Sequence, residues 1–113
     1  MANSIQFGRS DNGFGAVTPV GTTSATTAIL VNGINTVTSA SGTTACKLPD
    51  NAGGPVLVRN TAATAVNLDV FPPTLGTING GTATTGSVAI AQNKVGVFWP
   101  HSNGLDYTFH LGA

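Results

Sequence analysis

Alternation of apolar and polar residues runs through most of the chain from Ala28 onward. It is clearest in residues 105–111, where Leu, Tyr, Phe and Leu alternate with Asp, Thr and His. A period of two is the pattern of a strand with one face toward a core. Other short runs, separated by Gly, Ser-Gly and Pro turn signals, are residues 28–32, 35–39, 43–49, 55–60, 65–71, 87–90 and 95–99. The pattern predicts about eight short strands and no amphipathic helix.

Two pairs of neighbouring runs are predicted to form antiparallel hairpins. In the first, residues 55–60 and 65–71 pair across the sequence TAAT, so that Val56 lies opposite Val70 and Val58 lies opposite Leu68. This register gives the hairpin one wholly aliphatic face. Pro72 and Pro73 then end the strand, because neither can donate a ladder hydrogen bond.

The second predicted hairpin joins residues 87–90 to residues 95–99 across the turn AQNK. In this register Trp99 continues an apolar face that belongs to the core. Phe98 points to the opposite face, where it is a candidate for a subunit interface. Gly96 lacks a side chain, so another backbone or ring can approach it closely.

The predicted fold class is all-β: a single small β-sandwich or jelly-roll-like barrel of about eight short antiparallel strands. Residues 28–113 form the body of this fold. Residues 1–27 are rich in Gly, Thr and Ser, with few apolar anchors, and are predicted to form an extended N-terminal arm. Such a segment is either a disordered terminus or an arm that gains order on assembly with a neighbour. Its candidate contacts with a capsid or another subunit are Ile5, Phe7 and Phe14.

Charge is scarce and balanced. Only 7 % of the residues are charged, the net charge is zero, and glutamate is absent. Nucleic-acid binding depends on clustered cations that displace counterions from phosphates, so four dispersed cations argue against a DNA or RNA partner. In the first predicted hairpin Arg59 and Asp69 are diagonal neighbours, and we expect a surface ion pair worth less than about 1 kcal/mol.

Residues that carry chemistry do not form a recognisable catalytic or metal-binding pattern. His110 and Asp106 share a strand face but are about 13 Å apart, which is too far for a His–Asp hydrogen bond. A hydrolase site would need a histidine, His101 or His110, close to Ser102 or an aspartate. Cys46 is the single cysteine, and we expect it to be a buried small hydrophobe. The prediction is a non-enzymatic protein without a metal or cofactor.

No run of residues has the composition of a secretory peptide or of a membrane-spanning segment of about 20 apolar residues. The sequence therefore predicts synthesis in the cytoplasm and no membrane partner.

The middle of the chain resembles small virion proteins of tailed bacteriophages, specifically head decoration or capsid cement proteins. The resemblance covers about residues 43–100. It is carried by a turn ending in Leu-Pro, two strand-type runs, a Gly-Thr-Ile-Asn-Gly turn and a later strand, at residues 48–49, 54–61, 66–72, 76–80 and 87–90. A late aromatic strand follows these elements. Similar modules are also found in phage tail and fibre proteins.

The resemblance implies a small β-rich protein that binds the outer surface of an expanded icosahedral shell, commonly as an oligomer, and braces its capsomers. The implied partners are the major capsid protein and further copies of the chain, as a dimer or trimer. The implied location is the outer capsid surface of a virion assembled in the host cytoplasm. The alternative is a receptor- or glycan-binding module of a phage tail fibre, for which Trp99 or Phe98 would have to be exposed.

Overall fold

The computed structural model describes residues 13–26 and 28–112, and within these ranges the chain forms eight strands and no helix. The prediction of an all-β fold is confirmed. No helix in the described part is long and apolar enough to cross a membrane. The strands are β1 (Gly13–Val17), β2 (Gly33–Val37), β3 (Ala45–Lys47), β4 (Val56–Asn60), β5 (Leu68–Phe71), β6 (Val88–Ile90), β7 (Val95–Pro100) and β8 (Tyr107–Leu111).

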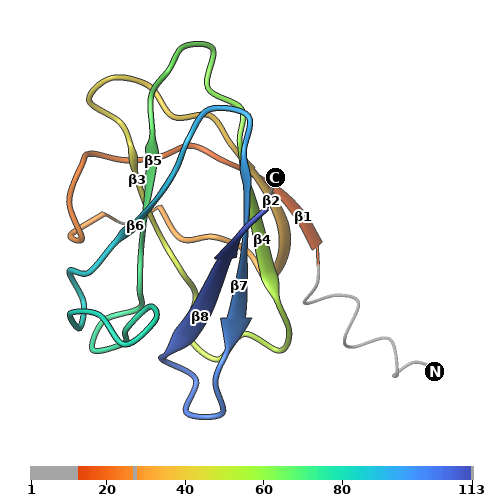
Figure 1. Ribbon diagram of the computed structural model, residues 1–113, viewed down its shortest axis with the longest axis vertical. Coiled ribbons are helices and arrows are strands. Elements are labelled where there is room, and N and C mark those ends of the chain that lie inside the picture. Colours follow the sequence, from red (N-terminus) through yellow and green to blue (C-terminus); the bar gives the residue numbers. More distant parts are fainter. Residues whose placement is uncertain (1–12, 27, 113) are drawn as a thin grey trace.

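The strands form two mixed sheets (Figure 1). A five-stranded sheet has the order β1-β2-β4-β7-β8, and a three-stranded sheet has the order β3-β5-β6. The pairs β1–β2, β2–β4 and β3–β5 are parallel, whereas β4–β7, β5–β6 and β7–β8 are antiparallel. The prediction of purely antiparallel strands is therefore wrong. β1 lies within the segment predicted to be an N-terminal arm.

The chain alternates between the two sheets from β2 to β5, and this overturns the first predicted hairpin. β4 belongs to the five-stranded sheet and β5 to the three-stranded sheet. Val58 lies opposite Gly96, while Leu68 lies opposite Ile90. Each of these strands reaches a parallel neighbour through a crossover that includes a strand of the other sheet. The expected diagonal contact between Arg59 and Asp69 is lost with the hairpin.

The second predicted hairpin is also wrong, because β6 and β7 lie in different sheets. β6 pairs with β5, and β7 lies between β4 and β8. The connecting residues leave the three-stranded sheet after Ile90. They then bind the backbone of β4: the Asn93 N–H donates to the Asn60 carbonyl at 2.8 Å, and the Asn60 N–H donates to the Lys94 carbonyl at 3.1 Å.

The two sheets share one hydrophobic core. The five-stranded sheet contributes Val56, Val58, Phe98 and Tyr107, and the three-stranded sheet contributes Cys46, Leu68, Val70 and Ile90. Phe98 is 0 % exposed and Trp99 is 49 % exposed, so the two faces of β7 are the reverse of those predicted. Gly96 allows a close approach, as expected: a Cβ atom there would lie 2.7 Å from the Phe109 ring. Cys46 is buried, which confirms its prediction.

The buried side-chain amide of Asn60 links the two sheets. Its Nδ2 donates to the carbonyls of Val66 and Ile90, each at 2.9 Å. Its Oδ1 accepts from the Ala62 N–H at 3.1 Å and from Ser39 Oγ at 3.0 Å. These bonds hold the segment after β4 against the end of β6. They satisfy polar groups that would be costly to bury alone.

Replacing Asn60 with alanine should lower the free energy of unfolding by about 3–5 kcal/mol. The substitution leaves several buried backbone groups without a partner, and each such group costs about 1–3 kcal/mol. Chemical denaturation followed by circular dichroism measures the change. The matched control is Asn67→Ala at an exposed position, which should change stability by less than about 0.5 kcal/mol. Equal losses in the two variants would contradict the linking role of Asn60.

Candidate functional site

An exposed row of largely apolar side chains crosses the outer face of the five-stranded sheet, the face turned away from the core. The register places one residue from each strand side by side in this row. We call it the outer row, and its members in sheet order are Phe14, Ile34, Leu57, Val97 and His110. With strands spaced at about 4.8 Å, the row is about 19 Å wide.

Exposure along the outer row is high for apolar residues. Phe14 is 84 % exposed and Ile34 is 44 % exposed, while Leu57 and Val97 are partly buried by their neighbours. Single exposed apolar side chains are common on protein surfaces, but a contiguous set of them marks an interaction surface. The arrangement is suited to contact with another apolar surface.

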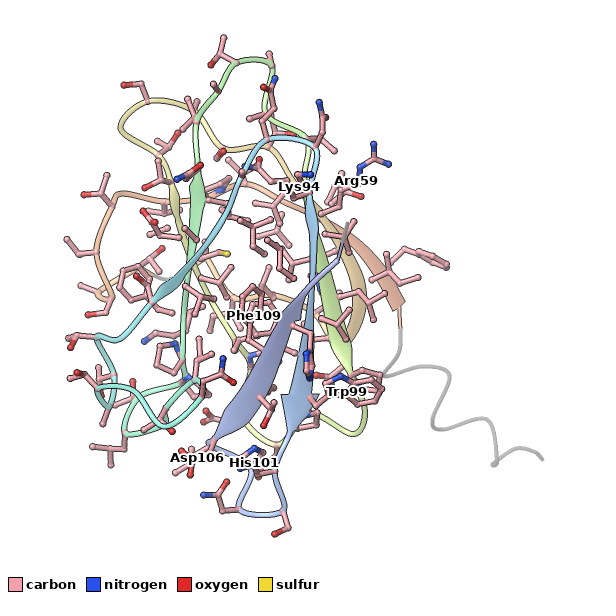
Figure 2. All side chains as sticks on the ribbon, viewed as in Figure 1. Arg59, Lys94, Trp99, His101, Asp106 and Phe109 are labelled. Atoms are coloured by element: carbon pink, nitrogen blue, oxygen red, sulfur yellow. The ribbon has the colours of Figure 1, made fainter. Side chains whose placement is uncertain are left out.

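Trp99 extends this face beyond the outer row. It follows Val97 on the same side of β7 and lies opposite Thr108 of β8. The Thr108 hydroxyl is in turn 2.8 Å from Nε2 of His101. This end of the sheet therefore combines a half-exposed indole ring with polar groups that hydrogen-bond (Figure 2).

Asp106 fixes the loop between β7 and β8. Its Oδ1 accepts from the Thr77 N–H at 2.9 Å and from the Thr77 hydroxyl at 3.1 Å. Its Oδ2 accepts from Asn103 Nδ2 at 2.7 Å. The bond from Asn103, the bonds from Thr77 and the nearby His101 lower the pKa of Asp106 below its ordinary value of 3.8. These contacts attach the loop beside Trp99 to the backbone and side chain of Thr77.

The opposite end of the face carries positive charge. Arg59 lies next to Leu57 on the outer side of β4 and opposite Val95 of β7. Figure 2 shows Arg59 and Lys94 close together at the upper end of the sheet, with Trp99 at the lower end. The outer face thus runs from a cationic end, across the apolar outer row, to an aromatic end.

A small open cleft of about 230 Å³ lies elsewhere on the molecule. It is lined by Ile29, Lys47, Leu48, Pro49, Asp50 and Thr74. Lys47 Nζ donates to the Thr74 hydroxyl at 3.3 Å across it. The cleft holds two charges of opposite sign, and Lys47 is already engaged with the protein.

The structure separates the residues that the sequence predicted as interface contacts. Phe14 is exposed and stands at one end of the outer row. Phe98 packs inside the core with its ring centroid 4.8 Å from that of Phe109, so it is removed from the candidate interface. Ile5 and Phe7 lie outside the described residues. Sequence reasoning missed the outer row because its members come from five strands whose partners the pattern did not reveal.

In the described part of the chain, the groups considered for catalysis do not form the hydrogen bonds that a hydrolase site would need. Within residues 13–26 and 28–112, neither histidine ring has a hydrogen bond to Ser102 or to an aspartate. In the same ranges no group of three or more His, Cys, Asp or Glu side chains gathers as metal ligands would. Burial, with a smaller effect of Asp69, raises the pKa of the Cys46 thiol to about 12. This thiol is protonated at neutral pH and enclosed by the core.

Comparison with known proteins gave no match to a family model, to a curated protein or to a solved structure.

The lowered pKa of Asp106 predicts a specific acid sensitivity. Its contribution to stability is fully present above pH 3.8 and is lost as the pH falls through the lower folded-state pKa. The variant Asp106→Asn should be less stable than the wild type at neutral pH, and the difference should vanish in acid. Thermal melting across this pH range measures both effects. Asn103→Ala removes the largest cause of the shift and should show an intermediate acid dependence. An Asp106→Asn variant with the full acid-dependent loss of the wild type would contradict this assignment.

Proposed function

We propose that this protein is a virion structural protein that binds the outer surface of a phage capsid and stabilises its capsomers as a decoration or cement protein. Its body is a β-sandwich formed by the two sheets, and it acts through buried contact area rather than chemistry. The observation that carries the proposal is the outer row, with Phe14 and Ile34 exposed on a regular sheet. The resemblance of residues 43–100 to such proteins adds the identity of the partner.

The outer face suits a partner that is itself a flat protein surface. Apolar area in the outer row supplies most of the affinity on burial, at about 25 cal/mol per Å². Arg59 at one end adds charge complementarity to an acidic partner residue, which sets orientation more than affinity. A rigid sheet loses little conformational entropy on binding, unlike a mobile loop.

The exposed ring of Trp99 favours one alternative, a receptor- or glycan-binding module of a tail fibre. Aromatic rings stack on the apolar faces of sugars, and the neighbouring His101 and Thr108 supply hydrogen-bonding groups. Under this alternative, binding depends on Trp99 and not on Ile34. A glycan array probed with the wild type and with Trp99→Ala distinguishes it from the capsid proposal.

Binding to shells should depend on the outer row. The wild-type protein should co-sediment with expanded empty phage capsids that lack it and raise their melting temperature. Ile34→Asp places a carboxylate in the row between Phe14 and Leu57, where burial without a partner is costly, so it should weaken binding about tenfold or more. The matched control, Leu75→Asp, changes another exposed apolar residue away from this face and should bind like the wild type.

Two results would count against the proposal: wild-type protein that neither sediments with shells nor stabilises them, or Ile34→Asp protein that binds as tightly as the wild type.

The N-terminal contacts have a separate test. Because residues 13–17 form β1, a truncation has to stop at residue 12 to preserve the sheet. Deletion of residues 1–12 removes Ile5 and Phe7 and should weaken binding to shells without changing the circular dichroism of the body. Unchanged binding would assign the whole contact to the body.

A further inference from the structure

The two edge strands of the five-stranded sheet, β1 and β8, differ in whether their free backbone groups are bonded to another segment. A loop covers β8. The Thr77 carbonyl accepts from the Tyr107 N–H, and the Asn79 N–H donates to the Tyr107 carbonyl, both at 2.9 Å. The Asn79 side chain continues this pairing, because its Oδ1 accepts from the Phe109 N–H at 2.9 Å. A loop thus occupies the outward backbone groups of Tyr107 and Phe109, as an added strand would.

Among residues 13–26 and 28–112, no segment covers the free edge of β1 in this way. Within the residues that the structure describes, the only strand paired with β1 is β2. Its sequence, GFGAV, contains neither a charged residue nor a proline, and these are the residues that usually protect a sheet edge. Phe14 stands on this edge with 84 % of its surface exposed. Strand β1 is therefore a template for another strand, formed of apolar and small residues.

We propose that β1 pairs with β1 of a second copy of this chain, antiparallel across a two-fold axis at Gly15. This closes a symmetric dimer whose two five-stranded sheets join into one. A two-fold interface uses the same residues on both sides, so it needs no second surface. Because the net charge is zero, there is little overall repulsion between copies. The inference does not depend on capsid binding, since it concerns the free protein.

The sequence of β1 fits this register. With the axis at Gly15, Phe14 of each copy lies opposite Ala16 of the other on the outer face, so each large side chain meets a small one. Gly15 lies opposite itself and presents no side chain at the axis. Its own packing also requires glycine, because a Cβ atom there would lie 2.9 Å from Cγ2 of Val31. Pairing covers the exposed Phe14 ring and the outward N–H and C=O groups of alternate residues.

The mass of the protein in solution tests the dimer. Light scattering coupled to size-exclusion chromatography should give twice the mass of one chain for the wild type. Ala16→Asp places a carboxylate against the second copy's Phe14 and should weaken dimerisation about tenfold or more. The matched control, His110→Asp, puts the same charge on the same face at the opposite edge and should remain dimeric.

Disulfide trapping tests the register. Phe14→Cys and Ala16→Cys chains, mixed and oxidised with copper phenanthroline, should form cross-linked dimers efficiently, because the two positions face each other. Each variant oxidised alone should cross-link much less, because identical positions are diagonal neighbours. Cys46 is buried and does not compete.

A monomeric or trimeric wild type overturns the inference, as does cross-linking that is no better in the mixture than in either variant alone. Failure of these tests leaves binding to shells unaffected, so the two proposals are separately testable.

Discussion

The buried side-chain amide of Asn60 is the polar constraint that joins the two sheets. An amide in a core must satisfy its donors and acceptors, and Asn60 does so with backbone groups from two segments: Ala62 and Val66 in the connection after β4, and Ile90 at the end of β6. Those bonds fix where the chain leaves β4 and where it returns from β6. They therefore tie the connection after β4, in which the chain passes from one sheet to the other, to the end of β6.

The positions of seven strands, β2 to β8, were largely predictable from the sequence, because alternation marks which residues can be buried on one face. Residues 28–32 were also expected to be a strand but form only an isolated bridge at Ile29, and β1 was not predicted. The pairing of the strands was not predictable from the sequence. Both β4 and β5 alternate between buried and less buried residues, and that pattern suits two strands of one hairpin as well as two strands in separate sheets. One contact that joins the two sheets is polar, between the Asn60 side chain and the distant Ile90 carbonyl. Hydrophobic periodicity carries no information about such a contact.

At β7, in the candidate site, hydrophobic periodicity was again not enough to predict the structure. Periodicity identified two opposite faces on this strand but not which of them meets the core, and Phe98 and Trp99 were assigned the wrong way round. Gly96, which was expected to permit a close approach, shares the inward face with Phe98 and leaves room for the Phe109 ring. The outer row was beyond prediction because it needs the register of five strands at once. Phe14 alone could be named in advance, as an apolar residue in a segment too polar to bury it.

The loop that covers β8 limits how many further strands can add to the five-stranded sheet. A subunit with two open sheet edges is a bifunctional monomer, and each addition leaves a new reactive end, so growth continues into fibrils. Asn79 and Thr77 occupy one edge of the five-stranded sheet, which leaves the described part of the chain monofunctional in this respect. When a second subunit adds at the remaining edge, β1, neither subunit has an open edge left in this sheet, so growth stops. An asparagine in a surface loop thereby sets the upper limit on how far this sheet can grow.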